Sequence, residues 1–192
     1  MALTKLQQRL YKDAEEIAGM VGVDFWNAGR VEDTENRTVS LRVTIARLVI
    51  AEVVTQYTLF DEMLMDYLCR YYFQKLDPFR VGIYWKQKKF RVFVHFMLDE
   101  MYLLKKMQTV NAIKPLPKAV RETIQKVNAI RNAMAHSFFP ENRKEYMKEA
   151  GRAGKVTYSG KDIRTPDGLR QFQNDCHEAQ RYLKKMVDRL WA

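Results

Sequence analysis

Three residues near the end of a predicted helix, Arg131, Asn132 and His136, have side chains suited to phosphodiester chemistry. An imidazole titrates near neutral pH, so His136 can take up and return a proton. A guanidinium presents a planar fork of donors to a phosphate and stabilises the charge that develops on it. An Asn amide can orient either group. With RNA the 2′-hydroxyl supplies the nucleophile, so this chemistry requires no metal ion and no cofactor.

The spacing of these residues places two of them on one narrow helical face. Ala129, Asn132, Ala133 and His136 follow one another at i, i+3, i+4 and i+7, about 100° or more from the apolar stripe of the same helix. The two alanines would let a second helix approach closely and would leave the imidazole in the resulting crevice. Arg131 lies about 140° from His136 and reaches the same pocket through its length. The structural alternative is a surface Arg pair and a His that caps the helix C-terminus.

The segment Arg-Asn, three residues, then His-Ser on a helix resembles the signature of the HEPN superfamily. In that family an Arg is followed after four to six residues by a His, often with a polar residue directly after the Arg. The resemblance covers Val127 to Phe138 and is only architectural elsewhere. It implies a helical bundle that dimerises and places two motif copies in a shared cleft. Many members are metal-independent ribonucleases, often toxins or antiviral effectors, and some are inactive relatives.

The leading hypothesis is therefore a metal-independent endoribonuclease of the HEPN type. His136 would act as general base or acid, Arg131 would bind the scissile phosphate, and Asn132 would orient one of them. The expected products are a 2′,3′-cyclic phosphate and a 5′-hydroxyl. The expected partners are RNA, a second copy bound through the Ala129/Asn132/Ala133/His136 face and, for a toxin, an antitoxin protein.

Two other hypotheses stay open. One is a non-catalytic HEPN-like module that binds RNA or a protein, because Phe138 stands where many toxin members carry Tyr and Gln125 where some relatives carry an acid. The other is an unrelated helical interaction or scaffold protein, in which Arg131 and His136 would lie apart and would not face a cleft.

A second candidate region is basic and aromatic. Residues 84–91 carry four cations and three rings, a composition that can contact phosphates and stack on bases. The alternative is a solvated helix flank with buried rings. A further stretch, residues 143–164, has seven Lys or Arg against three acids and could also flank the cleft. The RNA-binding candidates in the first region are Lys86, Lys88, Lys89 and Arg91.

Composition bounds the remaining possibilities. A chain of 192 residues predicts a single domain over 1–192, and its formal net charge of +10 predicts attraction to polyanions. Cys69 and Cys176 are far apart, which gives no zinc pattern and favours two buried, inert thiols. The N-terminal residues lack the apolar core of a signal peptide, and the apolar run 43–60 contains charges. We expect a cytoplasmic protein with no metal and no membrane partner.

Eight Gly and five Pro among 192 residues favour long helices. The apolar periodicity predicts an all-α bundle of about five helices, with a small β-hairpin inserted before the C-terminal helix. A polar loop is expected at about 22–38, with Phe25 and Trp26 as its anchors, and a hairpin-containing insert at about 140–165. Thr165-Pro166 reads as an N-cap and first helical residue. The predicted hairpin strands are 156–158 and 161–163.

Apolar stripes locate the helices. The region 39–76 reads as one helix or as two that divide near 55–58, and its acids Glu52, Asp61, Glu62 and Asp66 favour a solvated face over an acidic site. His95 and His177 are expected to be structural or exposed. The stripes are Leu6, Leu10, Ala14, Ile17 and Val21; Phe90, Val94, Met97, Met101 and Leu104; Val120, Ile124, Val127, Ile130 and Met134 in a helix over 118–138; and Leu169, Phe172, Cys176, Ala179, Leu183, Met186 and Leu190.

Overall fold

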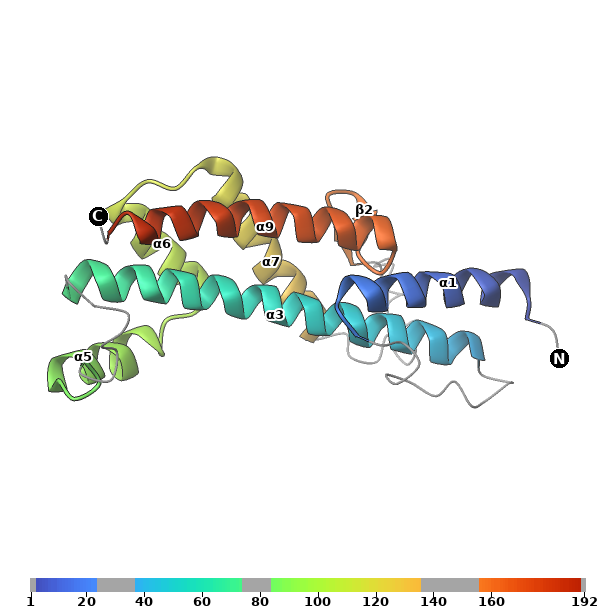
Figure 1. The fold of residues 1–192 in the computed structure, drawn as a ribbon, viewed down its shortest axis with the longest axis horizontal. Coiled ribbons are helices and arrows are strands. Elements are labelled where there is room, and N and C mark those ends of the chain that lie inside the picture. The colour runs from blue at the N-terminus through green and yellow to red at the C-terminus, as the bar shows by residue number, and fades with distance from the viewer. Residues whose placement is uncertain (1–2, 24–36, 74–83, 136–155, 191–192) are drawn as a thin grey trace, which may run out of the picture. The chain divides into compact units, whose positions relative to one another are not determined.

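The structure is a computed structural model that describes residues 3–23, 37–73, 84–135 and 156–190. The described chain is all-α apart from one two-stranded hairpin directly before the last helix, as predicted (Figure 1). Phe25, Trp26 and residues 140–155 of the predicted insert lie outside the described residues. The elements are α1 (Lys5–Met20), α3 (Arg37–Phe73), α5 (Lys88–Phe93), the π-helical η2 (Val94–Leu98), α6 (Leu103–Ile113), α7 (Lys118–Ala135), β1 (Thr157–Tyr158), β2 (Lys161–Asp162) and α9 (Pro166–Asp188).

The chain forms two compact units, each built from separate stretches. The first unit comprises Met1–Thr55 and Ala129–Asn174, and the second comprises Gln56–Asn128 and Asp175–Ala192. The long helices α3, α7 and α9 therefore contribute residues to both units. The single domain expected over 1–192 stays a prediction.

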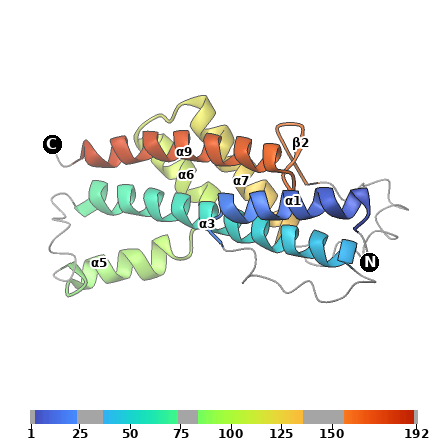
Figure 2. The same ribbon diagram turned by 45° about the vertical axis from the view of Figure 1, so that its right-hand side comes forward.

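In the first unit, α1 lies along the N-terminal half of α3 (Figure 1, Figure 2). A capping box starts α1, because the Thr4 hydroxyl accepts from the Gln7 amide at 3.2 Å while the Gln7 side chain accepts from the Thr4 amide at 3.0 Å. The middle of the predicted α1 stripe is buried at Ala14 and Ile17, whereas Leu6 at its start is 49% exposed. The fully buried residues of α1 therefore all lie in its C-terminal half.

The hairpin is held by its turn and by one ring. Thr157 pairs with Asp162 and Tyr158 with Lys161, across a turn in which Ser159 and Gly160 have φ of 48° and 83°. Two successive positive φ angles are the requirement of the tight hairpin turn that matches strand twist. The Tyr158 ring is buried and meets Phe172 of α9 edge-on, with centroids 5.3 Å apart. This contact fixes the hairpin to the helix that follows it.

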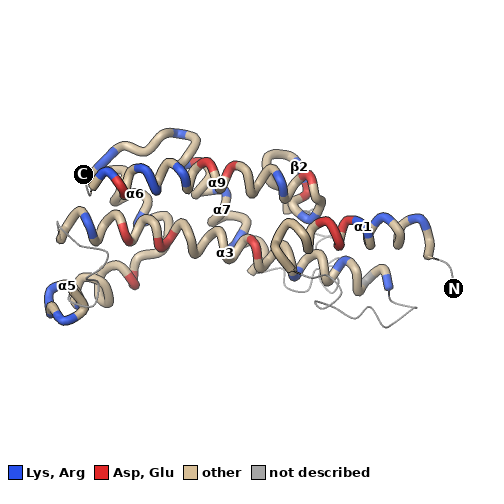
Figure 3. The backbone as a smooth tube through the Cα atoms, in the orientation of Figure 1, with Lys and Arg blue, Asp and Glu red and all other residues tan. Residues whose placement is uncertain are grey.

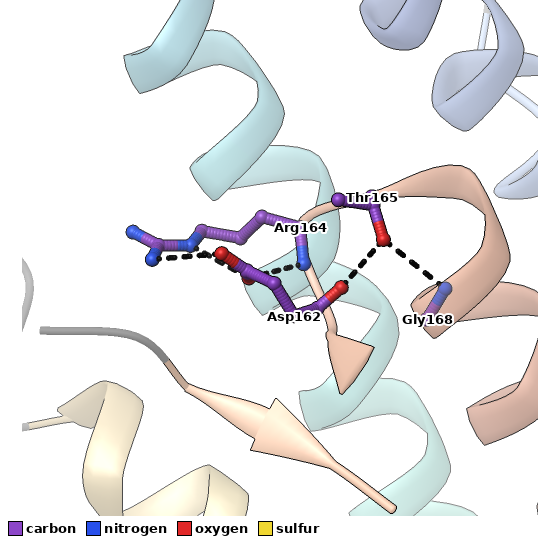
Figure 4. A network of polar contacts seen from close by, with 4 residues as sticks. All are labelled: Asp162, Arg164, Thr165 and Gly168. Atoms are coloured by element: carbon purple, nitrogen blue, oxygen red, sulfur yellow. Dashed lines mark hydrogen bonds and ion pairs between the residues drawn. The ribbon is translucent and has the colours of Figure 1, made fainter. Parts of the chain in front are cut away.

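A polar network joins the hairpin to α9 (Figure 4). The Thr165 hydroxyl accepts from the Gly168 amide at 3.2 Å, which confirms Thr165 as N-cap, and donates to the Asp162 carbonyl at 2.7 Å. The Asp162 carboxylate accepts from the backbone amide of Arg164 at 3.0 Å and from its guanidinium. The backbone at Gly168 approaches the backbone of Asp162 closely. A Cβ added to Gly168 would lie 2.1 Å from the Asp162 carbonyl oxygen.

Helix α3 is continuous, which settles whether the region 39–76 is one helix or two. The Thr55 hydroxyl donates to the backbone carbonyl of Ala51 at 2.9 Å, so this β-branched residue satisfies its hydroxyl group within the helix. By length and composition alone, the helix over residues 40–73 could cross a membrane, because an 18-residue window within it has a mean hydropathy of 1.4. Core helices of soluble proteins have the same length and composition, and the absence of a membrane partner stays a prediction. Charged residues within this range are Arg42, Arg47, Glu52, Asp61, Glu62, Asp66 and Arg70.

In the second unit, the C-terminal half of α9 runs beside α3 (Figure 1, Figure 2). Between these helices, the side-chain amide of Gln180 donates to the side-chain oxygen of Gln56 at 2.5 Å. Lys106 of α6 is buried and its Nζ lies 2.6 Å from the Asp61 carboxylate of α3. Because a buried ammonium needs a partner, this ion pair fixes α6 against α3.

The predicted stripe from Phe90 to Leu104 is wrong in its second half. The backbone amide of Asp99 donates to the carbonyl of Val94, five residues back, at 2.9 Å. Helix α6 begins only at Leu103. This π-helical turn inserts an extra residue into the helical period, so Leu98 and Leu103 are buried. Met97 is 48% exposed instead, and Met101 and Leu104 are half-buried.

Both thiols are buried in the structure, as predicted. Cys69 and Cys176 are free, and neither is accessible at the surface. Burial raises the pKa of the Cys69 thiol to about 12, with the nearby Asp66 carboxylate adding to the shift and Arg70 opposing it. The nucleophilic thiolate is therefore a negligible species at neutral pH.

Gly168→Ala should destabilise the protein, because its Cβ would meet the Asp162 backbone and the hairpin would have to move. We expect a loss of about 1–3 kcal/mol in the free energy of unfolding, measured by urea titration. Gly19→Ala is the matched control, since a Cβ there meets nothing within 4 Å. It should leave stability unchanged or raise it by up to about 1 kcal/mol. Equal effects of the two changes would contradict the close approach at Gly168.

Neither cysteine should react with Ellman's reagent in the native protein at pH 8, because both are buried and the raised pKa of Cys69 keeps it protonated. Raising the pH to 9 should barely increase the rate, since that pH is still well below the folded-state pKa of Cys69. In guanidinium chloride both thiols should react. Rapid labelling of one native thiol would contradict the packing around it.

Candidate nucleic-acid site

Helix α7 carries the candidate site, and its start is fixed by a side chain from the preceding helix. The Asn111 side-chain oxygen accepts from the Leu116 amide at 2.9 Å, which holds the connection before Pro117. The Arg121 amide then donates to the Pro117 carbonyl at 3.1 Å. The predicted core stripe is confirmed, because all five members are buried: Val120, Ile124, Val127, Ile130 and Met134.

Burial of Ile130 and Met134 turns the residues between them outward. Asn132 and Ala133 are exposed, and Ala129 one turn earlier is exposed as well. The small and polar face predicted from the spacing therefore lies on the surface within the described part of α7. Arg131 is exposed too, next to this face.

Arg131 and Asn132 form a hydrogen-bonded pair. The Arg131 Nη1 donates to the Asn132 Oδ1 at 3.2 Å. This bond uses the acceptor end of the amide, so the NH2 group of Asn132 remains as a donor. A guanidinium has no acceptor, and the pair therefore offers N–H groups and a positive charge. Such a surface favours an anion, and a phosphate has the geometry that a guanidinium fork matches.

His136 lies outside the described residues, together with Ser137 and Phe138. The described part of α7 ends at Ala135, one residue before it. Its contact with Asn132, its distance from Arg131 and its access to a cleft therefore stay predictions. The structure brings together two of the three predicted catalytic side chains.

A second match to the loose Arg–His spacing, Arg170 and His177, has a different environment. The Arg170 guanidinium lies 2.6 Å from the Glu16 carboxylate and 3.3 Å from that of Asp167. Two carboxylates around one guanidinium disfavour a phosphate at the same place. His177 is exposed, as expected. Arg170 therefore forms an ion pair that links α9 to α1.

The four predicted RNA-binding cations are all exposed: Lys86, Lys88, Lys89 and Arg91. Of the three aromatic residues in 84–91, Phe90 is buried. Its ring meets those of Trp85 and Phe73 edge-on, each with centroids 5.3 Å apart. Trp85 is 39% exposed. The exposed cations and the buried Phe90 fit the alternative, a solvated helix flank with a buried ring, and RNA binding by this segment stays a prediction. This segment belongs to the second unit, whereas Arg131 and Asn132 belong to the first.

Three of the four predicted acids of α3 have structural partners, and the fourth, Glu62, is exposed. Asp61 pairs with Lys106, Asp66 lies 2.6 Å from the Arg70 guanidinium, and Glu52 accepts from the Gln173 amide at 3.0 Å. Within 3–23, 37–73, 84–135 and 156–190, no three His, Cys, Asp or Glu side chains gather as metal ligands do. His95 is exposed, with its Nδ1 3.1 Å from the Asp99 carboxylate.

Sequence reasoning missed the buried ion pair of Lys106 and Asp61. The partners are separated by 45 positions, and Lys106 directly follows a second lysine, which suggested a solvated pair. Its position three residues after Leu103 and four before Val110 was the available signal, since it lies on the buried side of α6. The pair acts in packing within the second unit.

Comparisons of the chain with protein-family models, with curated proteins and with solved structures find no match.

Proposed function

We propose that the chain is a metal-independent endoribonuclease of the HEPN type. The observation that carries the proposal is the exposed Arg131–Asn132 pair on α7, which presents N–H donors and a positive charge at the end of the helix that leads into His136. The proposal adds to this geometry the resemblance of residues 127–138 to the family motif. A phosphate bound by Arg131 would lie near the predicted position of the imidazole.

In the proposed reaction, His136 takes the proton from the 2′-hydroxyl of RNA. The 2′-oxygen forms a bond to the adjacent phosphorus, and the bond from phosphorus to the 5′-oxygen of the next nucleotide breaks. That oxygen leaves with a proton, which yields a 2′,3′-cyclic phosphate and a 5′-hydroxyl. Arg131 stabilises the charge that develops on the phosphate oxygens, and Asn132 orients the phosphate or the imidazole.

A homodimer belongs to the same proposal. Two copies would pair their α7 helices through Ala129, Asn132, Ala133 and His136, which brings two motif copies to one cleft. The exposure of Ala129 and Ala133 supports this, because alanines on an open helix surface permit the close approach of a second helix. The cations of residues 86–91 would bind RNA phosphates. A ribonuclease of this kind would fit a toxin or antiviral role in the cytoplasm. An antitoxin protein would then be a further partner.

Protein treated with EDTA should cleave mixed RNA, and His136→Ala should lower the rate by about 10²–10⁴-fold, as expected for loss of a general acid–base. Arg131→Ala should lower it by about 10²–10³-fold, because transition-state charge loses its donor. His177→Ala and Arg181→Ala are the matched controls, since both residues are exposed on α9. The products should carry cyclic phosphate, and a 2′-deoxy nucleotide at the cleavage position should block the reaction.

Each contrary outcome has a definite meaning for this prediction. Equal cleavage by the wild type and His136→Ala, or cleavage abolished by EDTA, would overturn the assignment. Salt-sensitive RNA binding without cleavage would select the non-catalytic HEPN-like module instead.

Ala133→Arg should weaken the α7 dimer, because a long charged side chain would occupy the place where the second helix approaches. We expect a shift toward monomer in sedimentation analysis and a parallel fall in cleavage per chain. Lys118→Ala, at the exposed start of the same helix, should change neither. Full activity in a monomeric Ala133→Arg protein would contradict the shared cleft.

A further inference from the structure

The segment α5–η2 and the two residues after it carry an exposed stripe of unusual order. Seven exposed residues recur at spacings of three, one, three, one, three and one. The π-helical turn keeps this stripe on one side, because its longer period holds residues four or five apart on the same face. The opposite side is the buried row of Phe90, Val94 and Leu98. The stripe consists of Lys88, Arg91, Val92, His95, Phe96, Asp99 and Glu100.

Charge is segregated along this stripe. Its first part is cationic, with Lys88 and Arg91, and its last part is anionic, with Asp99 and Glu100. No acid occurs between residues 84 and 98, and no Lys or Arg between 92 and 104. Figure 3 shows the two signs at opposite ends of this segment.

The middle of the stripe is apolar and strongly exposed. Phe96 is 75% exposed and Val92 44%, and the neighbouring Met97 and Tyr102 are 48% and 64% exposed. A groove of about 300 Å³ opens beside the stripe, lined almost wholly by apolar atoms. Exposed apolar surface of this density, between two charged ends, is typical of an interaction surface. The residues that line the groove are Leu68, Tyr72, Phe93, Met97, Leu98, Met101 and Thr109.

We infer that this stripe binds the same stripe of a second copy of the chain, in antiparallel orientation about a two-fold axis near His95. Such a contact is self-complementary, because each residue meets its counterpart from the other end. Arg91 then lies opposite Asp99 of the second copy, and Lys88 opposite its Glu100. Val92 lies opposite Phe96 at the centre. Both charged ends and the apolar middle are satisfied at once.

Other occupants satisfy only part of the stripe. An RNA backbone or an anionic lipid surface would be attracted by Lys88 and Arg91 but repelled by Asp99 and Glu100 on the same face. The exposed Lys86 and Lys89 lie outside the stripe, so they remain as RNA-binding candidates of this segment when the stripe is paired. The helical run from Lys88 to Leu98 spans about 16 Å, so the contact is small and we expect a concentration-dependent equilibrium. This interface is separate from the proposed α7 dimer and does not depend on the ribonuclease proposal.

The test uses sedimentation equilibrium of the full chain carrying Ala133→Arg, so that the α7 face does not contribute. Phe96→Asp should raise the dissociation constant at least tenfold. The pair Lys88→Glu with Arg91→Glu should weaken association to a similar degree, although it lowers the net charge by four and so reduces general repulsion between copies. The pair Asp99→Lys with Glu100→Lys should also weaken it.

Combination of the changes gives the sharper result. A chain with all four reversals should associate within about threefold of the starting protein, because the polarity of the stripe is inverted but still self-complementary. A mixture of the two double variants should form a heterodimer, since one stripe is then acidic at both ends and the other basic at both ends. The control is Lys184→Glu with Lys185→Glu on α9, which makes the same charge change at exposed positions and should not weaken association.

Three outcomes would overturn the inference. The first is a monomer at every accessible concentration, and the second is failure of both the four-fold reversal and the mixture to restore association. The third is binding of single-stranded RNA or phosphatidylserine vesicles that Phe96→Asp abolishes in a protein that does not self-associate. Circular dichroism should be unchanged in all variants, because every altered stripe residue is exposed. RNA cleavage is measured separately, so its loss does not bear on this result.

Discussion

Burial of one apolar stripe on α7 is the constraint on which the candidate site depends. Ile130 and Met134 are each nearly inaccessible to solvent, and burial of such a side chain contributes about 1.5–3 kcal/mol. A rotation of the helix that exposed them would also carry the Arg131 guanidinium toward the core, where an unpaired charge is strongly disfavoured. Both effects act in the same direction. The orientation of Arg131 and Asn132 therefore follows from the packing of residues that take no part in chemistry.

Local signals made much of the fold predictable from the sequence. The α7 and α9 stripes, the turn at Ser159-Gly160 and the cap at Thr165 each rest on residues close together in the chain, and the structure has them where the pattern placed them. The exception is Leu190 at the end of the α9 stripe, which is 40% exposed. Of the candidate site, only the exposure of Asn132 was predictable in this way, because it follows from the burial of Ile130 on the same helix. The role of His136 stays a prediction, since it lies outside the described residues.

The failures share a different origin. The stripe from Phe90 to Leu104 assumed one helical period, but a π-helical turn changes the period and a new helix starts at Leu103. The ion pair of Lys106 with Asp61 depends on two helices that meet only after folding. Neither the extra residue in a turn nor a partner 45 positions away leaves a periodic trace in composition. Sequence patterns predict which face of a regular helix a residue occupies. They do not predict it where the helical period changes or where the partner lies on a distant helix.

Net charge gains meaning only through the positions of the acids. Arg70, Lys106, Arg164 and Arg170 each have a carboxylate within about 3.3 Å, so much of their charge is balanced within the fold. Arg131 also lies at the surface, where its guanidinium donates at 3.2 Å to the oxygen of the neutral Asn132 side-chain amide. The stripe on α5–η2 is different again, because its acids lie on the same exposed face as its cations. The net charge of +10 therefore does not describe every surface, because this stripe carries its cations at one end and its acids at the other.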